Sequence, residues 1–249
     1  MRTIAITGAS SGIGAALARQ LAASDSDLAL IGRDAARLEA VAVDCRTRGA
    51  ACRTAALDVR DNAALAAFVG NSPIDLLILN AGILDGRHAG QTVEDGETAH
   101  RVLQTNLIAA IDALHLVLPG MRSRRSGEIV LVSSLAALVP LTDAPAYSAS
   151  KAGLLFYGLA LREAVAADGI KVVVACPGYV ATAMADIHIG ARPGEIAAED
   201  AAARILEGLR RNRATIGFPF VPFWLTRLCL LMPEALRRRL ERGTRFHVS

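Results

Sequence analysis

The sequence predicts an α/β fold, in which a parallel sheet is wound on both faces by helices. Along most of the 249 residues, short apolar runs alternate with longer segments of helical periodicity, and this alternation is typical of βαβ units. The apolar runs are nearly continuous, as in strands that are covered on both faces. Hydrophobic residues make up 53% of the chain, so we expect one large core and a single domain over residues 1–249.

Apolar runs and helical periodicity together predict the order of the elements. The predicted strands are residues 3–7, 27–31, 51–57, 75–79, 127–132, 170–175 and, at one edge, a short strand near 214–217. The predicted helices are residues 12–23, 34–48, 61–70, 97–118, 145–167 and 199–211. Pro119-Gly120 is expected to end the fourth helix, and Asp168-Gly169 the fifth, because proline and glycine interrupt helical hydrogen bonding.

A glycine-rich turn follows the first predicted strand. Gly8, Gly12 and Gly14 stand between that strand and an apolar helix, an order that is typical of a Rossmann-type dinucleotide-binding fold. Glycines let the backbone approach a pyrophosphate, and the helix N-terminus offers free N–H groups. The spacing Gly-x3-Gly-x-Gly also suits an ordinary strand-to-helix turn, so the context rather than the motif favours a nucleotide.

The end of the second strand predicts which nucleotide binds. NAD-binding folds usually place an acid there, whereas an arginine nearby suits the 2′-phosphate of NADP. This chain has Gly32 at that position, followed by Arg33, and Arg37 lies one helical turn later. Asp34 is better placed as the N-cap of the next helix. The sequence therefore favours NADP (NADPH) over NAD.

A phenol and an ammonium lie one turn apart on the fifth predicted helix. Tyr147 and Lys151 share one helix face at i, i+4. A nearby ammonium favours the phenolate, so the pKa of Tyr147 is expected to fall, which would suit it to general acid/base work on a substrate oxygen. Ser133 and Ser134 end the strand at 127–132, at the edge where open parallel sheets bind ligands. Tyr147 lies thirteen residues after Ser134.

Taken in order, these motifs resemble the short-chain dehydrogenase/reductase family, in its single-domain type of about 250 residues. The resemblance covers residues 1 to about 185 and is carried by Gly8/Gly12/Gly14, Asn80-Ala81-Gly82, Ser134, Tyr147-Ser148-Ala149-Ser150-Lys151 and Pro177-Gly178. It implies an NADP-dependent oxidoreductase that interconverts an alcohol and a ketone or aldehyde by hydride transfer. Leu79 departs from the family, which often has a second asparagine there.

The resemblance also implies roles for matching residues. Tyr147 is similar to the general acid/base, Lys151 to the residue that lowers its pKa and holds the nicotinamide ribose, Ser134 to the substrate-orienting hydroxyl, and Asn106 to the residue that holds a relay water. Asp58 resembles the adenine contact and Thr182 the carboxamide contact. The full set of implied cofactor-binding residues is Gly8, Ser10, Ser11, Gly12, Ile13, Gly14, Arg33, Asp58, Val59, Asn80, Ala81, Gly82, Tyr147, Lys151, Pro177, Gly178 and Thr182.

Two other functions stay open. An epimerase or dehydratase would use the nucleotide only transiently, but such relatives usually carry a longer substrate domain. A nucleotide-binding regulator or scaffold would keep the fold without turnover, although such a protein has no physical reason to keep Ser134, Tyr147 and Lys151 together. A net loss of nicotinamide absorbance would distinguish an oxidoreductase from an epimerase or dehydratase. Tyr147→Phe would distinguish an enzyme, which loses turnover, from a scaffold, which keeps its biological effect.

The C-terminal tail, 218–249, is apolar and then basic. Aromatic residues and leucines fill 217–232, and arginines follow at 237–239 and 242. Proline and arginine interrupt the apolar stretch, which is too short to span a bilayer. The tail is expected to be a lid over the substrate, a subunit interface or a peripheral membrane contact. In each case a large apolar surface suggests an apolar substrate.

Charge and cysteine usage favour a cytoplasmic protein. The net charge is only +3, but ten arginines and three acids lie from Arg204 onward, so the basic excess belongs to the tail and does not indicate nucleic-acid binding. The four cysteines and five histidines lack metal-ligand spacing, so we expect no metal site. No signal peptide is expected. The expected partners are a small carbonyl or alcohol substrate and further copies of the chain, in a homodimer or homotetramer.

Overall fold

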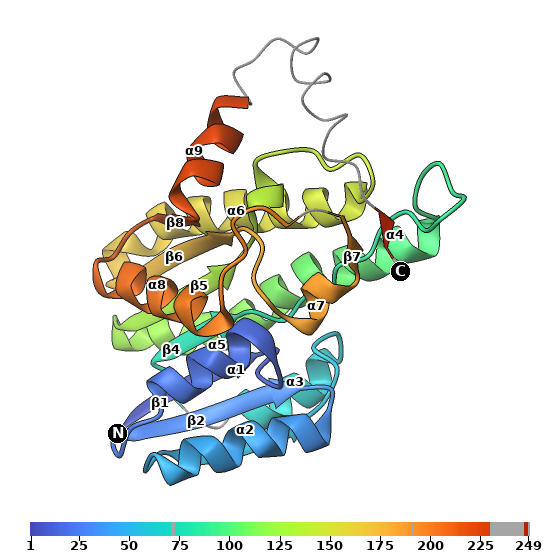
Figure 1. Cartoon of the computed structure of the whole chain (residues 1–249). Coiled ribbons are helices and arrows are strands. Elements are labelled where there is room, and N and C mark those ends of the chain that lie inside the picture. The colour runs from blue at the N-terminus through green and yellow to red at the C-terminus, as the bar shows by residue number, and fades with distance from the viewer. Residues whose placement is uncertain (71–72, 191, 230–246, 249) are drawn as a thin grey trace.

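The computed structural model describes residues 1–70, 73–190, 192–229 and 247–248. It is a three-layer α/β domain built on a seven-stranded parallel sheet with strand order β3-β2-β1-β4-β5-β6-β8 (Figure 1). The strands are β1 (Arg2–Thr7), β2 (Ser26–Gly32), β3 (Ala51–Ala56), β4 (Leu76–Leu79), β5 (Gly127–Val132), β6 (Ile170–Pro177) and β8 (Thr215–Phe218). All seven predicted strands are confirmed within a few residues, as is the doubly wound parallel fold.

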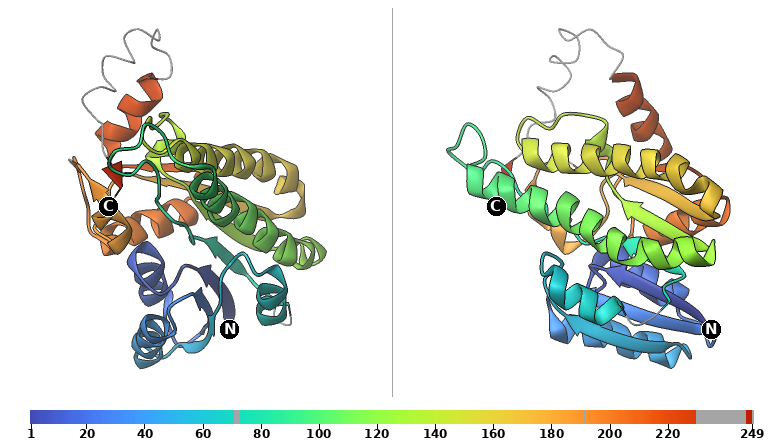
Figure 2. Two further views of the ribbon diagram at one scale, coloured as in Figure 1. Left: turned by 90° about the vertical axis from the view of Figure 1, so that its right-hand side faces the viewer. Right: turned by 180° about the vertical axis from the view of Figure 1, so that it is seen from behind.

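Helices cover both faces of this sheet. One face is packed by α1 (Gly12–Leu21), α2 (Ala35–Thr47) and α8 (Ala198–Arg210). The other is packed by α3 (Asn62–Val69), α5 (Ala109–Arg124) and α6 (Pro145–Val165). Alternate strand residues supply the two cores: Ile4 and Ile6 point into the first and Ala5 into the second. In both views of Figure 2, α5 and α6 run side by side on their face.

The fourth predicted helix is longer than expected. It runs as α4 (Gly96–Leu103), a π-helical turn (Gln104–Ile108) and then α5, which continues through Pro119 to Arg124. The prediction that Pro119-Gly120 ends it is wrong. Pro119 has no N–H, so the carbonyl of His115, four residues earlier, loses its helical hydrogen-bond partner. Both residues lie on the exposed side of the helix, where water can replace the lost hydrogen bond. The helix ends instead at Arg125, which adopts a left-handed conformation with φ 51°.

The segment Gly96–Arg124 is also long and apolar enough to cross a membrane by length and composition. Half of its most apolar window is buried inside the domain, and a core helix of a globular protein passes the same criterion. The length and composition of this segment are therefore weak evidence for a membrane span.

The edge strand β3 corrects another expectation. It was predicted to be covered on both faces, but none of its residues is buried, because it pairs only with β2 and ends the sheet. By contrast, Gly169 ends α6 and its short 3₁₀ extension (Ala166–Asp168) with φ 72°, as predicted. Asp34 is the N-cap of α2, as predicted, since its carboxylate accepts the Arg37 N–H at 2.9 Å.

Short elements follow the sheet's carboxyl edge. They are a 3₁₀ turn (Leu135–Ala137), α7 (Ala183–Asp186), α9 (Phe220–Cys229) and a two-stranded ribbon of β7 (His188–Ile189) and β9 (His247–Val248). The basic part of the tail, with arginines at 237–239 and 242, lies outside the described residues. In α9, Phe223 joins the core while Phe220, Trp224 and Leu228 are 71%, 46% and 52% exposed.

Candidate active site

The glycine turn and the end of β4 are tied together at the carboxyl edge of the sheet. The Thr7 hydroxyl accepts the backbone N–H groups of Asn80 (3.0 Å) and Ala81 (3.1 Å). The Asn80 amide in turn donates to the carbonyl of Gly8 at 3.1 Å. A side chain at Gly8 would place its Cβ 2.8 Å from the Ala81 Cα, so a glycine is required for the two turns to meet. Gly8 also has φ 67°, which favours glycine.

Gly14 lets α1 approach this turn closely. A Cβ at Gly14 would lie 2.2 Å from the Gly8 carbonyl oxygen and 2.6 Å from Asn80 Nδ2. Ser11, the N-cap of α1, makes no side-chain capping bond within the described residues. The first N–H groups of α1 therefore face the turn with the positive end of the helix dipole, an arrangement that suits a phosphate.

A cavity of about 220 Å³ opens beside this turn. Of the predicted cofactor-binding residues, it is lined by Gly8, Ser10, Ser11, Gly12, Ile13, Arg33, Asp58, Val59, Asn80, Ala81, Gly82 and Thr182. Gly14, Pro177, Gly178, Tyr147 and Lys151 do not line it. The cavity is also lined by Gly32, Asp34 and Arg37, which the sequence analysis noted without including them in that set, and by Leu57, Ile83, Thr105 and Met184, which it missed. Most are direct neighbours of predicted residues, which is the signal that would have found them.

One end of the cavity carries arginines. Arg33 and Arg37 both line it, and Asp34 Oδ2 accepts from Arg37 Nε at 2.6 Å. Asp58 is bound by Arg60, with Nη2 to Oδ2 at 2.7 Å, and this hydrogen bond is the main reason that the pKa of Asp58 is lowered. The positive charge of Arg33 acts in the same direction on Asp58. This end of the cavity thus has cationic groups suited to a phosphate.

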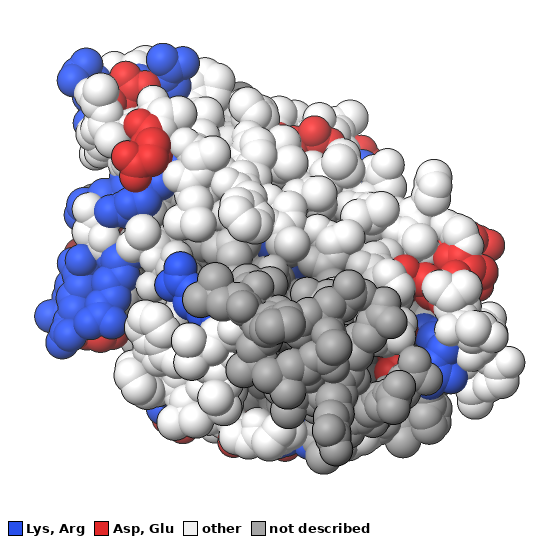
Figure 3. Space-filling view, turned by 90° about the horizontal axis from the view of Figure 1, so that it is seen from above, with Lys and Arg blue, Asp and Glu red and all other residues white. Residues whose placement is uncertain are grey.

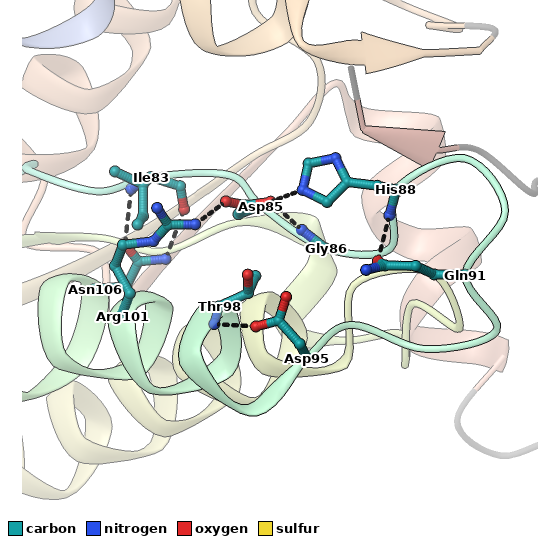
Figure 4. A network of polar contacts seen from close by, with 9 residues as sticks. All are labelled: Ile83, Asp85, Gly86, His88, Gln91, Asp95, Thr98, Arg101 and Asn106. Carbon is teal, nitrogen blue, oxygen red and sulfur yellow. Dashed lines mark hydrogen bonds and ion pairs between the residues drawn. The ribbon is translucent and has the colours of Figure 1, made fainter.

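The other end meets the first turns of α6. A Cβ at Gly82 would lie 3.3 Å from Lys151 Nζ and 3.2 Å from Asn106 Oδ1. The Asn106 amide is fully buried; its Oδ1 accepts the Ile83 N–H at 2.8 Å and its Nδ2 donates to the Ser150 hydroxyl at 3.2 Å. Figure 4 shows Asn106 reaching the loop at Ile83. Asn106 therefore ties the loop after β4 to α6.

The two serines at the end of β5 have different surroundings. Ser133 is buried, and its hydroxyl donates to the Lys151 carbonyl at 2.7 Å. The Ser134 side chain is partly exposed and hydrogen-bonds to Tyr147. The geometry thus places Ser134, not Ser133, beside the phenol.

The predicted acidification of Tyr147 is wrong for this structure. Burial raises the pKa of Tyr147, and the hydrogen bond with Ser134 only partly opposes this rise. The Lys151 Nζ lies 5.8 Å from the centre of the Tyr147 ring and donates to the Val132 carbonyl at 3.0 Å. Burial also lowers the pKa of Lys151 to about 8. Sequence spacing could not reveal this, because desolvation acts on both groups and favours their neutral forms.

Comparison with known proteins identifies the family. Residues 2–189 match the model of the family described as short chain dehydrogenase. The chain belongs to this family, and it is an oxidoreductase of the NAD(P)-dependent dehydrogenase and reductase type.

Individual relatives extend the likeness over the whole chain. Ketoacyl reductase HetN of Nostoc sp. is 35% identical over 185 residues, which are 72% of this chain and 63% of that protein, so the match spans less than two thirds of its length. An uncharacterized oxidoreductase of Myxococcus xanthus is 32% identical over 96% of this chain and 98% of its own. The solved structure of a short-chain dehydrogenase from Sphingobium yanoikuyae in complex with NADPH has a TM-score of 0.83 and 28% identity, covering 98% of this chain and 96% of that one.

Proposed function

We propose that the chain is an NADP-dependent reductase that converts a ketone or aldehyde to an alcohol, with Tyr147 as the general acid. The observation that carries this proposal is the hydrogen bond of Tyr147 with Ser134, on the same helix as the buried Lys151, whose Nζ lies beside Gly82 of the cavity. The glycine turn and the free N-terminus of α1 fit a pyrophosphate. The chemistry that bound NADPH supplies is hydride transfer to the carbonyl carbon.

The side chains account for the rest of the reaction. As the carbonyl oxygen gains negative charge, the hydroxyl of Ser134 stabilises it by a hydrogen bond. Tyr147 gives its phenolic proton to that oxygen, which becomes the hydroxyl of the product. The raised pKa of Tyr147 keeps the phenol protonated near neutral pH, which is the form that reduction requires. Lys151 Nζ lies beside Gly82 at the end of the cavity, where its ammonium would hold the nicotinamide ribose.

The choice of NADP rests on the arginine end of the cavity. Gly32 offers no carboxylate for a ribose hydroxyl, and the carboxylate of Asp34 is already held by Arg37. Arg33 lines the same cavity and suits a 2′-phosphate. The complex of the Sphingobium relative with NADPH supports the same choice.

An apolar substrate is proposed from the position of α9. This helix packs against the 3₁₀ turn that follows Ser134, so α9 lies near the proposed site, and its exposed residues Phe220, Trp224 and Leu228 are apolar. The ketoacyl reductase relative acts, by its name, on an acyl chain that carries a ketone. We therefore propose that the preferred carbonyl compounds carry an apolar chain.

The experiment that tests the function is a screen of ketones and aldehydes with NADPH, followed by Tyr147→Phe on the best substrate. Loss of the acid should lower kcat by about 10²- to 10⁴-fold, while NADPH still binds. Tyr157→Phe is a matched control, since Tyr157 lies on the same helix and contacts His115 at 2.9 Å rather than Ser134. Turnover that survives in Tyr147→Phe would show that another group moves the proton.

A further inference from the structure

Helix α6, which carries Tyr147, begins without a cap of its own. Its N-cap is Ala144, which makes no side-chain capping bond among the described residues, and its first residue is Pro145, which has no N–H. The N–H groups of Ala146 and Tyr147 are therefore the first that need an acceptor. Ala146 donates to Glu94 Oε1 at 2.6 Å. The cap for α6 thus comes from a loop that lies about fifty residues earlier in the chain.

That loop, between β4 and α4, is attached to the chain just before α6. The Arg87 N–H donates to the Asp143 carbonyl at 2.7 Å, and Arg87 Nε donates to Asp143 Oδ1 at 2.9 Å. Asp143 is only 2% exposed. A Cβ at Gly86 would lie 2.8 Å from the Ala144 Cβ, so the loop and the start of α6 are in close contact. The loop therefore reaches the start of α6 at two places, around Asp143 and at Ala146.

The same loop is anchored on its other side by a network of polar contacts (Figure 4). Asp85 pairs with Arg101 of α4. Within the loop, the His88 N–H donates to Gln91 Oε1 at 3.0 Å. Asp95 acts only within α4, where it accepts the Thr98 N–H at 2.7 Å. The loop that carries Glu94 is thus tied to α4 through Asp85 and to the start of α6 through Arg87, so the carboxylate is presented from a segment with contacts on both sides.

The carboxylate of Glu94 is in an unusual place for an acid. Its Oε2 is inaccessible to solvent and has no hydrogen-bond partner in the described part of the chain. Burial raises the pKa of Glu94, and the charges of Asp85 and Asp95 act in the same direction, while the bond from Ala146 opposes them. The positive end of the α6 dipole offsets part of this cost.

We propose that Glu94 is a positioning residue for Tyr147: by holding the first turn of α6 it keeps the phenol beside Ser134. Tyr147 directly follows Ala146, so fraying of this turn would move the phenol. Proton transfer needs donor and acceptor within hydrogen-bond reach, and a displacement of about 1 Å can cost about a hundredfold in rate. The catalytic consequence rests on the proposed function, whereas the fixing of the turn does not.

The test compares Glu94→Ala with Asp95→Ala. The two residues are neighbours in the chain, and each variant removes a carboxylate that caps a helix. Glu94 caps α6, whereas Asp95 caps α4. Glu94→Ala should make amide hydrogen exchange over residues 144–152 about fivefold faster or more, and Asp95→Ala should do so only at the start of α4. With NADPH and a ketone substrate, Glu94→Ala should lower kcat about tenfold with little change in KM, and Asp95→Ala should stay near wild type.

Two further variants distinguish a local effect on the first turn of α6 from a general loss of folding. Glu94→Gln keeps an acceptor oxygen and should restore most of the protection and of kcat. Glu94→Asp keeps the charge but is one methylene shorter, so it should behave like Glu94→Ala. Wild-type exchange over 144–152 in both Glu94→Ala and Glu94→Asp would overturn the proposal. If the wild type reduces no carbonyl compound, the proposed function fails, and the exchange measurement still decides the role of Glu94.

Discussion

At the scale of single residues, burial shifts the pKa values of Tyr147 and Lys151 more than neighbouring charges do. Lys151 is 4% exposed, and its ammonium has a pKa of about 8 because burial disfavours the charge. The folded protein therefore binds this proton less tightly than the unfolded chain. From this group alone, the free energy of unfolding should rise with pH between about 8 and 10.5.

Lys151→Met is accordingly expected to abolish turnover without destabilising the protein. At pH 7 the variant escapes a desolvation cost of at most about 3 kcal/mol, but it leaves the Val132 carbonyl without its donor, at about 1–3 kcal/mol. A net gain of about 1 kcal/mol is expected, and urea denaturation at pH 7 and pH 10 measures it. Lys171→Met, at an exposed lysine that pairs with Glu128 at 3.1 Å, is the control. A clear loss of stability in Lys151→Met at pH 7 would contradict this account.

Arg33→Ala tests the choice of nucleotide at the same scale. A charge-assisted bond to a 2′-phosphate predicts that KM for NADPH rises about tenfold or more, whereas KM for NADH changes little. Arg37→Ala should have a smaller effect, because Asp34 already holds Arg37. Steady-state kinetics with both nucleotides measure the difference, and an equal effect on NADH would refute the role of Arg33.

At the scale of elements, the turn between β1 and α1 depends on close backbone contact. In Gly14→Ala the new methyl group would clash with the Gly8 carbonyl oxygen at 2.2 Å, so the helix must move away from the turn. We expect NADPH affinity, measured by fluorescence titration, to fall about tenfold or more, with a stability loss of about 1–3 kcal/mol. Gly96→Ala is the control, since a methyl group there meets nothing within 4 Å among the described residues. Unchanged NADPH affinity in Gly14→Ala would count against the turn as the phosphate site.

Elements were the level at which the sequence was most informative. Strand ends, the cap at Asp34 and the stop at Gly169 depend on residue types close together in the chain, and they were predicted correctly. Pro119 was misjudged because a proline is tolerated where the affected carbonyl faces water, and exposure is a property of the fold. The lack of buried residues in β3 was missed for the same reason, since an apolar run does not say which strand lies at the edge.

At the scale of the whole molecule, the surface is unevenly charged and partly apolar. Seen from above in Figure 3, most of the described surface is uncharged, with Lys and Arg gathered along one side. Helix α9, with its exposed apolar residues Phe220, Trp224 and Leu228, lies on this upper part of the molecule (Figure 1). Whether the tail acts as a lid, a subunit interface or a membrane contact stays a prediction, as do the homodimer or homotetramer and the cytoplasmic location.

Replacing both Trp224 and Leu228 with Ser tests the apolar-substrate proposal. If this face helps to hold an apolar chain, kcat/KM should fall about tenfold for long-chain ketones and little for short ones. Val43→Ser is a control for surface polarity, since Val43 is 49% exposed on α2, a helix that packs the opposite face of the sheet. A series of ketones of increasing length provides the measurement, and an unchanged chain-length preference would argue against the proposal.

The order of strands and helices and the glycine turn follow from local chemistry: apolar periodicity and backbone freedom. The residues of the proposed catalytic set follow from the order of motifs along the chain and the family that this order resembles. The raised pKa of Tyr147, the burial of the Ser133 hydroxyl and the capping of α6 by Glu94 follow from neither. They depend on which side chains are desolvated together and on contacts between segments up to about fifty residues apart, and these exist only once the helices have packed on the sheet.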